Sequence, residues 1–171
     1  MFEVCEAVEV DGGVLVGHDG SVCAQEALIW AATLAGRARL PLHVLRAWNL
    51  TTAPRPAGWE PGVVPPMTDF ERAVRDELDA QVARAALDPS IQVTTHVLHR
   101  APAAGLIETA VGADLLVVGA RGHGGFAGLL LGSVSDQCVH HAACPVTVVR
   151  EGSGRRFPRV AAAAHDAAVG T

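Results

Sequence analysis

The chain has 171 residues, of which half are hydrophobic and 18% are charged. This length suits one domain, and the composition excludes a disordered chain. The formal net charge of −5 argues against nucleic acid as the main partner, because phosphate backbones are bound by basic surfaces.

Neither export nor membrane insertion is expected. Residues 1–10 hold three glutamates and no lysine or arginine, which is unlike a secretory signal. No apolar run approaches the ~20 residues of a membrane helix, and four scattered cysteines are too few for a secreted disulfide framework. We therefore expect a cytoplasmic protein without a membrane partner.

The first part of the chain predicts two strands and a helix. An irregular arm over residues 1–11 precedes the apolar run 14–16, which ends in Gly and Asp as a strand feeding a turn does. Ser21 is the expected N-cap of a helix that stops at Gly36. Residues 42–47 form the second strand.

A long segment separates this strand from the next helix. Residues 49–67 contain five prolines and two glycines, and a loop of this length fits either a functional flap or disorder. Thr68 to Glu71 form a capping box. Apolar residues at positions 70, 74, 78 and 82 then predict an amphipathic helix.

The second half predicts three more strands and two more helices. Alternation over 91–97 indicates a half-exposed edge strand, and a helix over 103–111 follows. The most apolar strand, 114–119, is expected inside the sheet. A second capping box, Ser133 to Asp136, opens a helix to about residue 142, and 146–149 form the last strand.

Strands that alternate with helices predict the α/β class, with a doubly wound parallel sheet covered on both faces. We expect one domain over residues 12–150. The remaining residues, 151–171, are rich in alanine, glycine and arginine without an apolar period, and we expect a flexible tail.

A glycine-rich segment after the fourth strand is the main functional signal. It runs from Gly119 to Ser133 and holds six glycines in its first fourteen residues. Glycines with positive φ let backbone N–H groups converge on an anion, and the following helix offers free N–H groups and a partial positive charge. The Ser133 hydroxyl, Arg121 and His123 can add to such a phosphate site. The alternative is a loop that only turns a corner, with Ser133 as a cap.

Better-known sites are excluded by spacing. The segment lacks the lysine of a P-loop, and no helix follows Gly122-x-Gly124-x-x-Ala127 as a dinucleotide fold requires. Cys138, His140, His141 and Cys144 suggest zinc, but on a helix the two Cys–His pairs diverge, so one tetrahedral centre cannot use all four. We expect no metal site, and no catalytic set of nucleophile, base and orienting group can be assembled.

Three segments in order resemble the universal stress protein family: residues 14–21, Gly119-x2-Gly122-x9-Gly132-Ser133, and residues 140–150. The similarity covers roughly residues 12–150. It implies a five-stranded parallel sheet in the order 3-2-1-4-5, with ligands at the carboxyl ends of the first and fourth strands. It also implies a homodimer formed through the last strand, Val146–Val149, although the tail after Glu151 could cover that edge instead.

The resemblance also implies the site residues. Gly17, His18 and Asp19 would approach adenine and ribose, with Asp19 as partner of the ribose hydroxyls unless it is only a turn residue. The backbone of Ala47 would face the adenine edge. The phosphates would be surrounded by Gly119, Arg121, Gly122, Gly124, Gly125, Gly132, Ser133 and Val134.

The chain departs from the family pattern at two places. Residues 126–131 contain no basic side chain, so Arg121, His123 and optionally Mg²⁺ must neutralise the phosphates, and the choice between ATP and a less charged nucleotide stays open. His18 stands where an apolar residue is usual. It would either stack on the base or be buried and hydrogen-bonded, and we favour the second.

The function expected from this resemblance is that of an ATP-binding, nucleotide-dependent regulator with little or no catalysis. One alternative is a ligand-free dimeric interaction module of the same fold. The other is an enzyme that slowly hydrolyses ATP or cleaves adenylate, but the S-G-G-x-D-S loop of that wider group is missing after the first strand.

Overall fold

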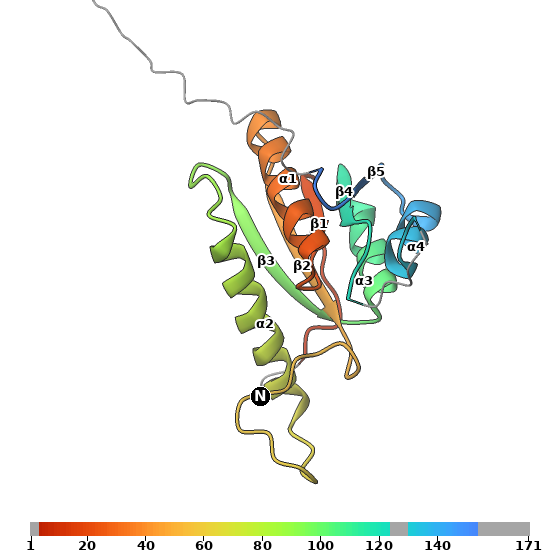
Figure 1. Cartoon of the computed structure of the whole chain (residues 1–171). Helices are drawn as coiled ribbons and strands as arrows, with labels where there is room; N and C mark the ends of the chain where they lie inside the picture. Colours follow the sequence, from red (N-terminus) through yellow and green to blue (C-terminus); the bar gives the residue numbers. More distant parts are fainter. Residues whose placement is uncertain (1–3, 124–129, 154–171) are drawn as a thin grey trace, which may run out of the picture.

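The computed structural model describes residues 4–123 and 130–153 (Figure 1). The strands form one five-stranded parallel sheet in the order β3-β2-β1-β4-β5, which confirms the predicted fold and its strand order. Gly124, Gly125 and the tail from residue 154 lie outside the described residues. The strands are β1 Val14–Gly17, β2 Leu42–Trp48, β3 Val93–His99, β4 Leu115–Gly119 and β5 Val146–Val149; the helices are α1 Val22–Ala38, α2 Met67–Arg84, α3 Pro102–Thr109, the short 3-10 helix η1 Ala110–Gly112, and α4 Ser133–His141.

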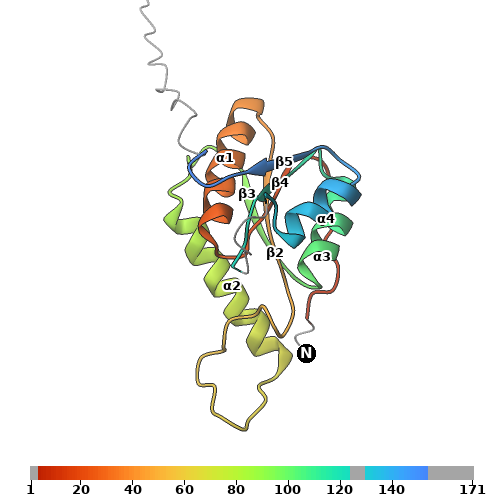
Figure 2. The ribbon, with the colours of Figure 1, turned by 45° about the vertical axis from the view of Figure 1, so that its right-hand side comes forward.

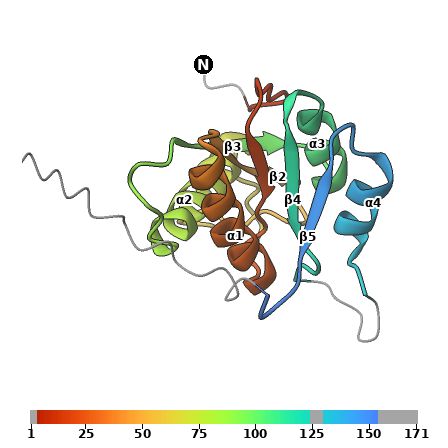
Figure 3. The same cartoon turned by 90° about the horizontal axis from the view of Figure 1, so that it is seen from above.

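Helices cover both faces of the sheet. Figure 3 shows α1 and α2 on one face and α3 and α4 on the other. Each strand therefore supplies side chains to two cores: Val14 and Val16 of β1 pack on the α1–α2 side, and Leu15 packs on the opposite side. Such double burial explains why β1 and β4 are almost continuously apolar. Of the described helices, none is both long and apolar enough to cross a bilayer.

The sheet brings the carboxyl ends of β1 and β4 side by side. Val16 lies opposite Val117 in the register, and the chain leaves these two strands toward opposite sides of the sheet, since β1 is followed by α1 and β4 by α4. Ligands of open α/β sheets bind at this kind of switch point. The N-terminal arm contacts the sheet at its β3 edge, where the His99 amide donates to the Cys5 carbonyl at 2.8 Å.

Two predicted boundaries of α1 and α2 were wrong. Helix α1 continues past Gly36 to Ala38 and ends at Arg39, whose φ of 57° is left-handed. Helix α2 begins at Met67 with Pro66 as N-cap, so the capping box at Thr68 is not used; Pro66 fixes its own backbone and the chain turns there. The predicted cap of α1 is confirmed, because Ser21 Oγ accepts from the Ala24 amide at 3.2 Å.

The loop between β2 and α2 extends beyond the carboxyl end of β2 (Figure 2). Its first residues form a turn in which the Asn49 side chain accepts from the amides of Thr51 and Thr52 at 3.0 and 3.1 Å. Both threonines lie at the edge of the main cavity of the protein. The interpretation of residues 49–67 as a flap stays a prediction.

Two histidines meet between β2 and β3. His43 Nδ1 lies 3.1 Å from His96 Nε2, because the strand register places His96 opposite Leu45, two residues along from His43 on the same face. Burial lowers the pKa of both side chains, and the charges of His43 and Arg75 add to this effect on His96.

We expect the protein to lose stability in mildly acidic solution. The pKa of each histidine in the folded chain lies below its ordinary value of 6.5. The unfolded chain therefore binds protons first, and the free energy of unfolding decreases as the pH falls below that value. Urea unfolding at about pH 7.5 and about pH 5.5 measures the loss. The variant His96→Gln does not titrate at this position, so its free energy of unfolding should decrease less between the two pH values. An equal decrease would show that this histidine pair does not cause the loss of stability.

Candidate functional site

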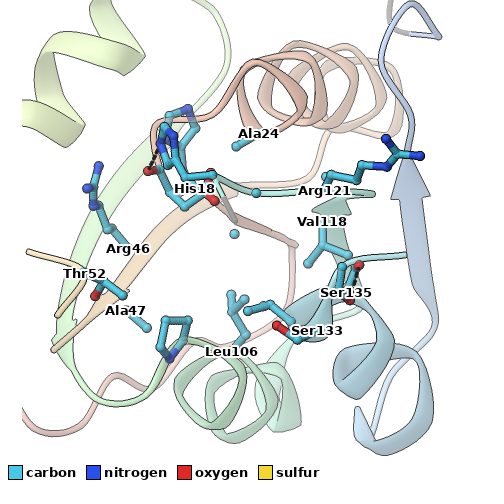
Figure 4. A pocket seen from close by; sticks show the side chains of 18 of the residues that line it. His18, Ala24, Arg46, Ala47, Thr52, Leu106, Val118, Arg121, Ser133 and Ser135 are labelled. Atoms are coloured by element: carbon cyan, nitrogen blue, oxygen red, sulfur yellow. Dashed lines mark hydrogen bonds between the residues drawn. The ribbon is translucent and has the colours of Figure 1, made fainter. Parts of the chain in front are cut away.

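A cavity of about 900 Å³ opens at the carboxyl ends of β1 and β4 (Figure 4). Its size is at the upper end of the range for small-molecule sites. All ten predicted site residues in the described part of the chain line it: Gly17, His18, Asp19, Ala47, Gly119, Arg121, Gly122, Gly132, Ser133 and Val134. The fold thus assembles residues from four separate segments around one space.

The turn between β1 and α1 holds the only acidic residue that the resemblance placed in the site. Asp19 is exposed, and its Oδ1 accepts from the Ser21 amide at 2.9 Å. Gly20 between them has a φ of +88°, a conformation that favours glycine. Asp19 is therefore a turn residue, and its second oxygen, Oδ2, lies beside Gly122. The two roles considered for Asp19 are compatible, because they use different oxygens.

Two described glycines of the glycine-rich segment, Gly119 and Gly122, serve close packing. None of Gly119, Gly122 and Gly132 has a positive φ, so the expected left-handed cradle is not formed by these three. A Cβ on Gly122 would collide with Asp19 Oδ2, and a Cβ on Gly119 would lie 2.8 Å from the Cys23 carbonyl carbon. These glycines let the segment lie directly against the β1–α1 turn and the first turn of α1.

Helix α4 points its first turn at the cavity. Its N-cap is Gly132, and Ser133 is the first helical residue, so the predicted capping box from Ser133 is wrong. The Ser135 hydroxyl instead donates to the carbonyls of Gly132 and Ala120, at 2.9 and 3.0 Å. This bridge ties the helix start to the end of β4. The amides of the first turn have no acceptor within the helix, and its dipole favours an anion there.

The two expected rim cations do not point at the cavity centre. Figure 4 shows the Arg121 side chain extending outward on the side of β5. The His123 ring lies across the β1–α1 turn, where its Nε2 donates to the Asp19 carbonyl at 3.1 Å. His123 therefore joins the glycine-rich segment to the turn that carries Asp19.

An ion pair made by a buried arginine behind the turn was missed. Arg46 of β2 is 6% exposed, and its Nη2 lies 3.1 Å from Glu77 Oε2 on α2. Its backbone neighbour is Ala47, and Gly20 packs close to its Nη1. An arginine inside the apolar strand 42–48 was a signal for a buried charge with a partner, but nothing local to the sequence indicated Glu77.

His18 is buried and hydrogen-bonded, as favoured from the sequence. Only 3% of the residue is exposed. Its Nδ1 accepts from the Gly20 amide at 3.2 Å, and its Nε2 lies 3.2 Å from Gln25 Oε1. Burial lowers the pKa of His18, and Arg46 adds to this, whereas the Gln25 hydrogen bond, Asp19 and Glu77 oppose it.

Among the described residues, no three or more histidine, cysteine or acidic side chains are grouped for a metal ion. Cys138, which the sequence placed in a possible zinc set, is fully buried. Burial raises its pKa to about 11, with a further contribution from Cys144. A buried thiol with a raised pKa is typical of an unreactive, structural cysteine.

The sequence model of the universal stress protein family matches residues 13–150. The chain belongs to the universal stress protein family. A universal stress protein of Mycobacterium tuberculosis is 36% identical over 140 residues, which cover 81% of this chain and 45% of the relative. A relative from Mycolicibacterium smegmatis is 36% identical over 138 residues, with 80% and 45% covered. This universal stress protein thus spans about half the length of the curated relatives it matches.

Solved structures show the same architecture. The crystal structure of a universal stress protein in complex with cAMP has 27% sequence identity and a TM-score of 0.52, over 84% of this chain and 98% of that one. The universal stress protein UspA from Lactobacillus plantarum has 23% identity and a TM-score of 0.57, over 84% and 100%. The second likeness concerns the fold alone.

Proposed function

We propose that this universal stress protein binds an adenine nucleotide, ATP in the first place, and acts as a nucleotide-dependent regulator with little or no turnover. The observation that carries the proposal is the convergence of ten residues predicted from the sequence on one cavity at the switch point of the sheet. The related structure solved with cAMP supports adenine as the base.

Different residues that line the cavity would bind the base, the ribose and the phosphates of a nucleotide. The backbone of Ala47 would bind the adenine edge, and the Leu106 side chain would provide an apolar surface in the same cavity. Asp19 Oδ2 would accept hydrogen bonds from the ribose hydroxyls. The first turn of α4 would receive the phosphates through its free amides. Asp136 also lines the cavity, and its charge favours Mg²⁺ as a counter-ion for a triphosphate.

A regulator without rapid turnover fits the surroundings of Asp19. One oxygen of this carboxylate is engaged by the Ser21 amide and the other packs on Gly122, an arrangement suited to holding a ligand. Hydrolysis would require a positioned water and a base near the phosphates. In the proposed pose Asp19 is assigned to the ribose and Asp136 to the counter-ion, so neither is assigned as that base.

We propose in addition a cytoplasmic homodimer formed through β5. Within the described chain, β5 pairs with β4 alone, so its other edge can accept a strand. Helix α1 contacts β5 and exposes Val22 and Ile29, at 64% and 40% of their surfaces. A second copy would cover both the free edge and these side chains.

Native mass spectrometry of the purified chain tests these proposals together, because it reports bound nucleotide and subunit number. Denaturation followed by chromatography then identifies the nucleotide, and calorimetry with ATP, ADP, AMP and cAMP ranks affinities. A dimer that gives no heat with any of the four nucleotides would favour the ligand-free module. Steady ATP turnover above ~0.1 s⁻¹ would favour an enzyme.

Two substitutions at Asp19 separate ribose binding from turn formation. Asp19→Ala should weaken nucleotide binding about tenfold to hundredfold, the cost of losing hydrogen bonds to a charged group. Asp19→Asn keeps an acceptor for the Ser21 amide but loses the charge and one acceptor oxygen. We expect the Asn variant to remain weak in calorimetry, and full recovery would assign Asp19 to the turn alone.

A further inference from the structure

His18 has a buried position directly before Asp19. The turn residues 18–21 are held by two side chains of their own: His18 Nδ1 accepts from the Gly20 amide at 3.2 Å, and Asp19 Oδ1 accepts from the Ser21 amide at 2.9 Å. Gly20, which lies between Asp19 and Ser21, has a left-handed backbone. The Asp19 carboxylate is thus held in the same turn that the His18 hydrogen bond closes.

These contacts define which nitrogen of His18 carries the proton. A backbone amide only donates, so Nδ1 must be unprotonated to accept from Gly20. The proton is then on Nε2, which donates to Gln25 Oε1 at 3.2 Å. The Gln25 amide group in turn donates to the Gln81 carbonyl of α2 at 3.3 Å, which orients its oxygen toward His18. The chain of donors and acceptors is consistent only with a neutral ring.

We propose that neutral His18 is the positioning residue of the Asp19 turn, and that its protonation withdraws Asp19 from the nucleotide and weakens binding in mildly acidic solution. This inference rests on the proposed nucleotide function. A protonated ring carries a hydrogen on Nδ1, which would face the Gly20 N–H, so two donors would oppose each other. The turn would have to open, and Asp19 is its next residue.

The electrostatic surroundings give the direction of the pH effect. The charged groups facing His18 are Asp19 on its own turn, Arg46 of β2 and Glu77 of α2; His123 also packs on the neighbouring Gly20. Burial dominates and lowers the pKa of His18 from 6.5. The ring is therefore neutral at neutral pH and becomes charged only as the pH falls through this lowered pKa, so binding decreases in that direction.

The test is calorimetric titration of cAMP into the full chain from about pH 8 to about pH 5.5, a range in which its phosphodiester keeps one charge. Wild type should lose about fivefold to tenfold in affinity, the value of one neutral hydrogen bond. His18→Asn places an amide oxygen near the position of Nδ1 and does not titrate, so its affinity should stay constant. A pH dependence in His18→Asn equal to that of wild type would overturn the proposal.

Two further measurements complete the design. His18→Leu removes the acceptor, so its affinity should be low at every pH, and wild-type affinity in this variant would contradict the positioning role. Long-range ¹H–¹⁵N spectra of the ligand-free wild-type chain should show that the neutral His18 ring carries its proton on Nε2. A proton on Nδ1 instead would overturn the inference. Failure of both cAMP and ATP to bind wild type at about pH 8 would instead refute the proposed function.

Discussion

The Gly122→Val variant is expected to lose its adenine nucleotide, with an affinity weakened about hundredfold or more. A Cβ at this position would collide with Asp19 Oδ2, and the two further methyl groups of valine enlarge the conflict. The carboxylate proposed to bind ribose would be displaced together with its turn. Both residues are exposed, so the core is untouched and the variant should fold. Chromatography of the denatured protein and calorimetry measure the loss.

Gly36→Ala is the matched control for this variant. Gly36 lies inside α1, far along the helix from the site, and its added Cβ would meet only the Ile91 side chain at 3.4 Å. An alanine in a helix stabilises it by up to about 1 kcal/mol relative to glycine, and nucleotide content should not change. Retention of nucleotide by Gly122→Val at the level of this control would refute the assigned site.

Gly119→Ala is expected to lower the free energy of unfolding by about 1–3 kcal/mol, the usual cost of overpacking. Its Cβ would lie 2.8 Å from the Cys23 carbonyl carbon and 3.0 Å from the Ala24 amide nitrogen. These are backbone atoms in the first turn of α1, which cannot move without shifting the helix. Urea unfolding compares the variant with wild type, and Gly119→Val should be less stable still.

Gly132→Ala is the corresponding control, because it adds the same methyl group at the other end of the segment. Its Cβ would have ordinary contacts, the nearest being the Ala120 carbonyl oxygen at 3.5 Å, and its φ of −79° suits alanine. The stability should stay within about 0.5 kcal/mol of wild type. Equal stability of the two alanine variants would show that Gly119 is not a packing glycine.

Helix ends show where local patterns stop being sufficient. Ser21 was predicted correctly as a cap, because a serine before an apolar period is a local signal. Gly36 looked like a stop, yet α1 continues through it to Ala38 and ends at Arg39, which has a left-handed backbone. The cap expected from Ser133 is not formed, because Gly132 is the N-cap. The Ser135 hydroxyl donates to the Ala120 carbonyl just after β4, a contact that sequence spacing does not predict.

The sequence by itself determined the order of the strands and helices and the parallel arrangement of the sheet. It also determined that the predicted site residues lie at the carboxyl ends of the strands. Apolar periodicity and turn residues are local properties, and the resemblance supplied the strand order. Only the tertiary structure decided that Arg46 pairs with Glu77, that His43 meets His96, and that Gly122 makes room for Asp19. Each of these contacts joins residues that are distant in the chain. Their distance in space depends on strand register and helix packing, which local sequence patterns do not determine.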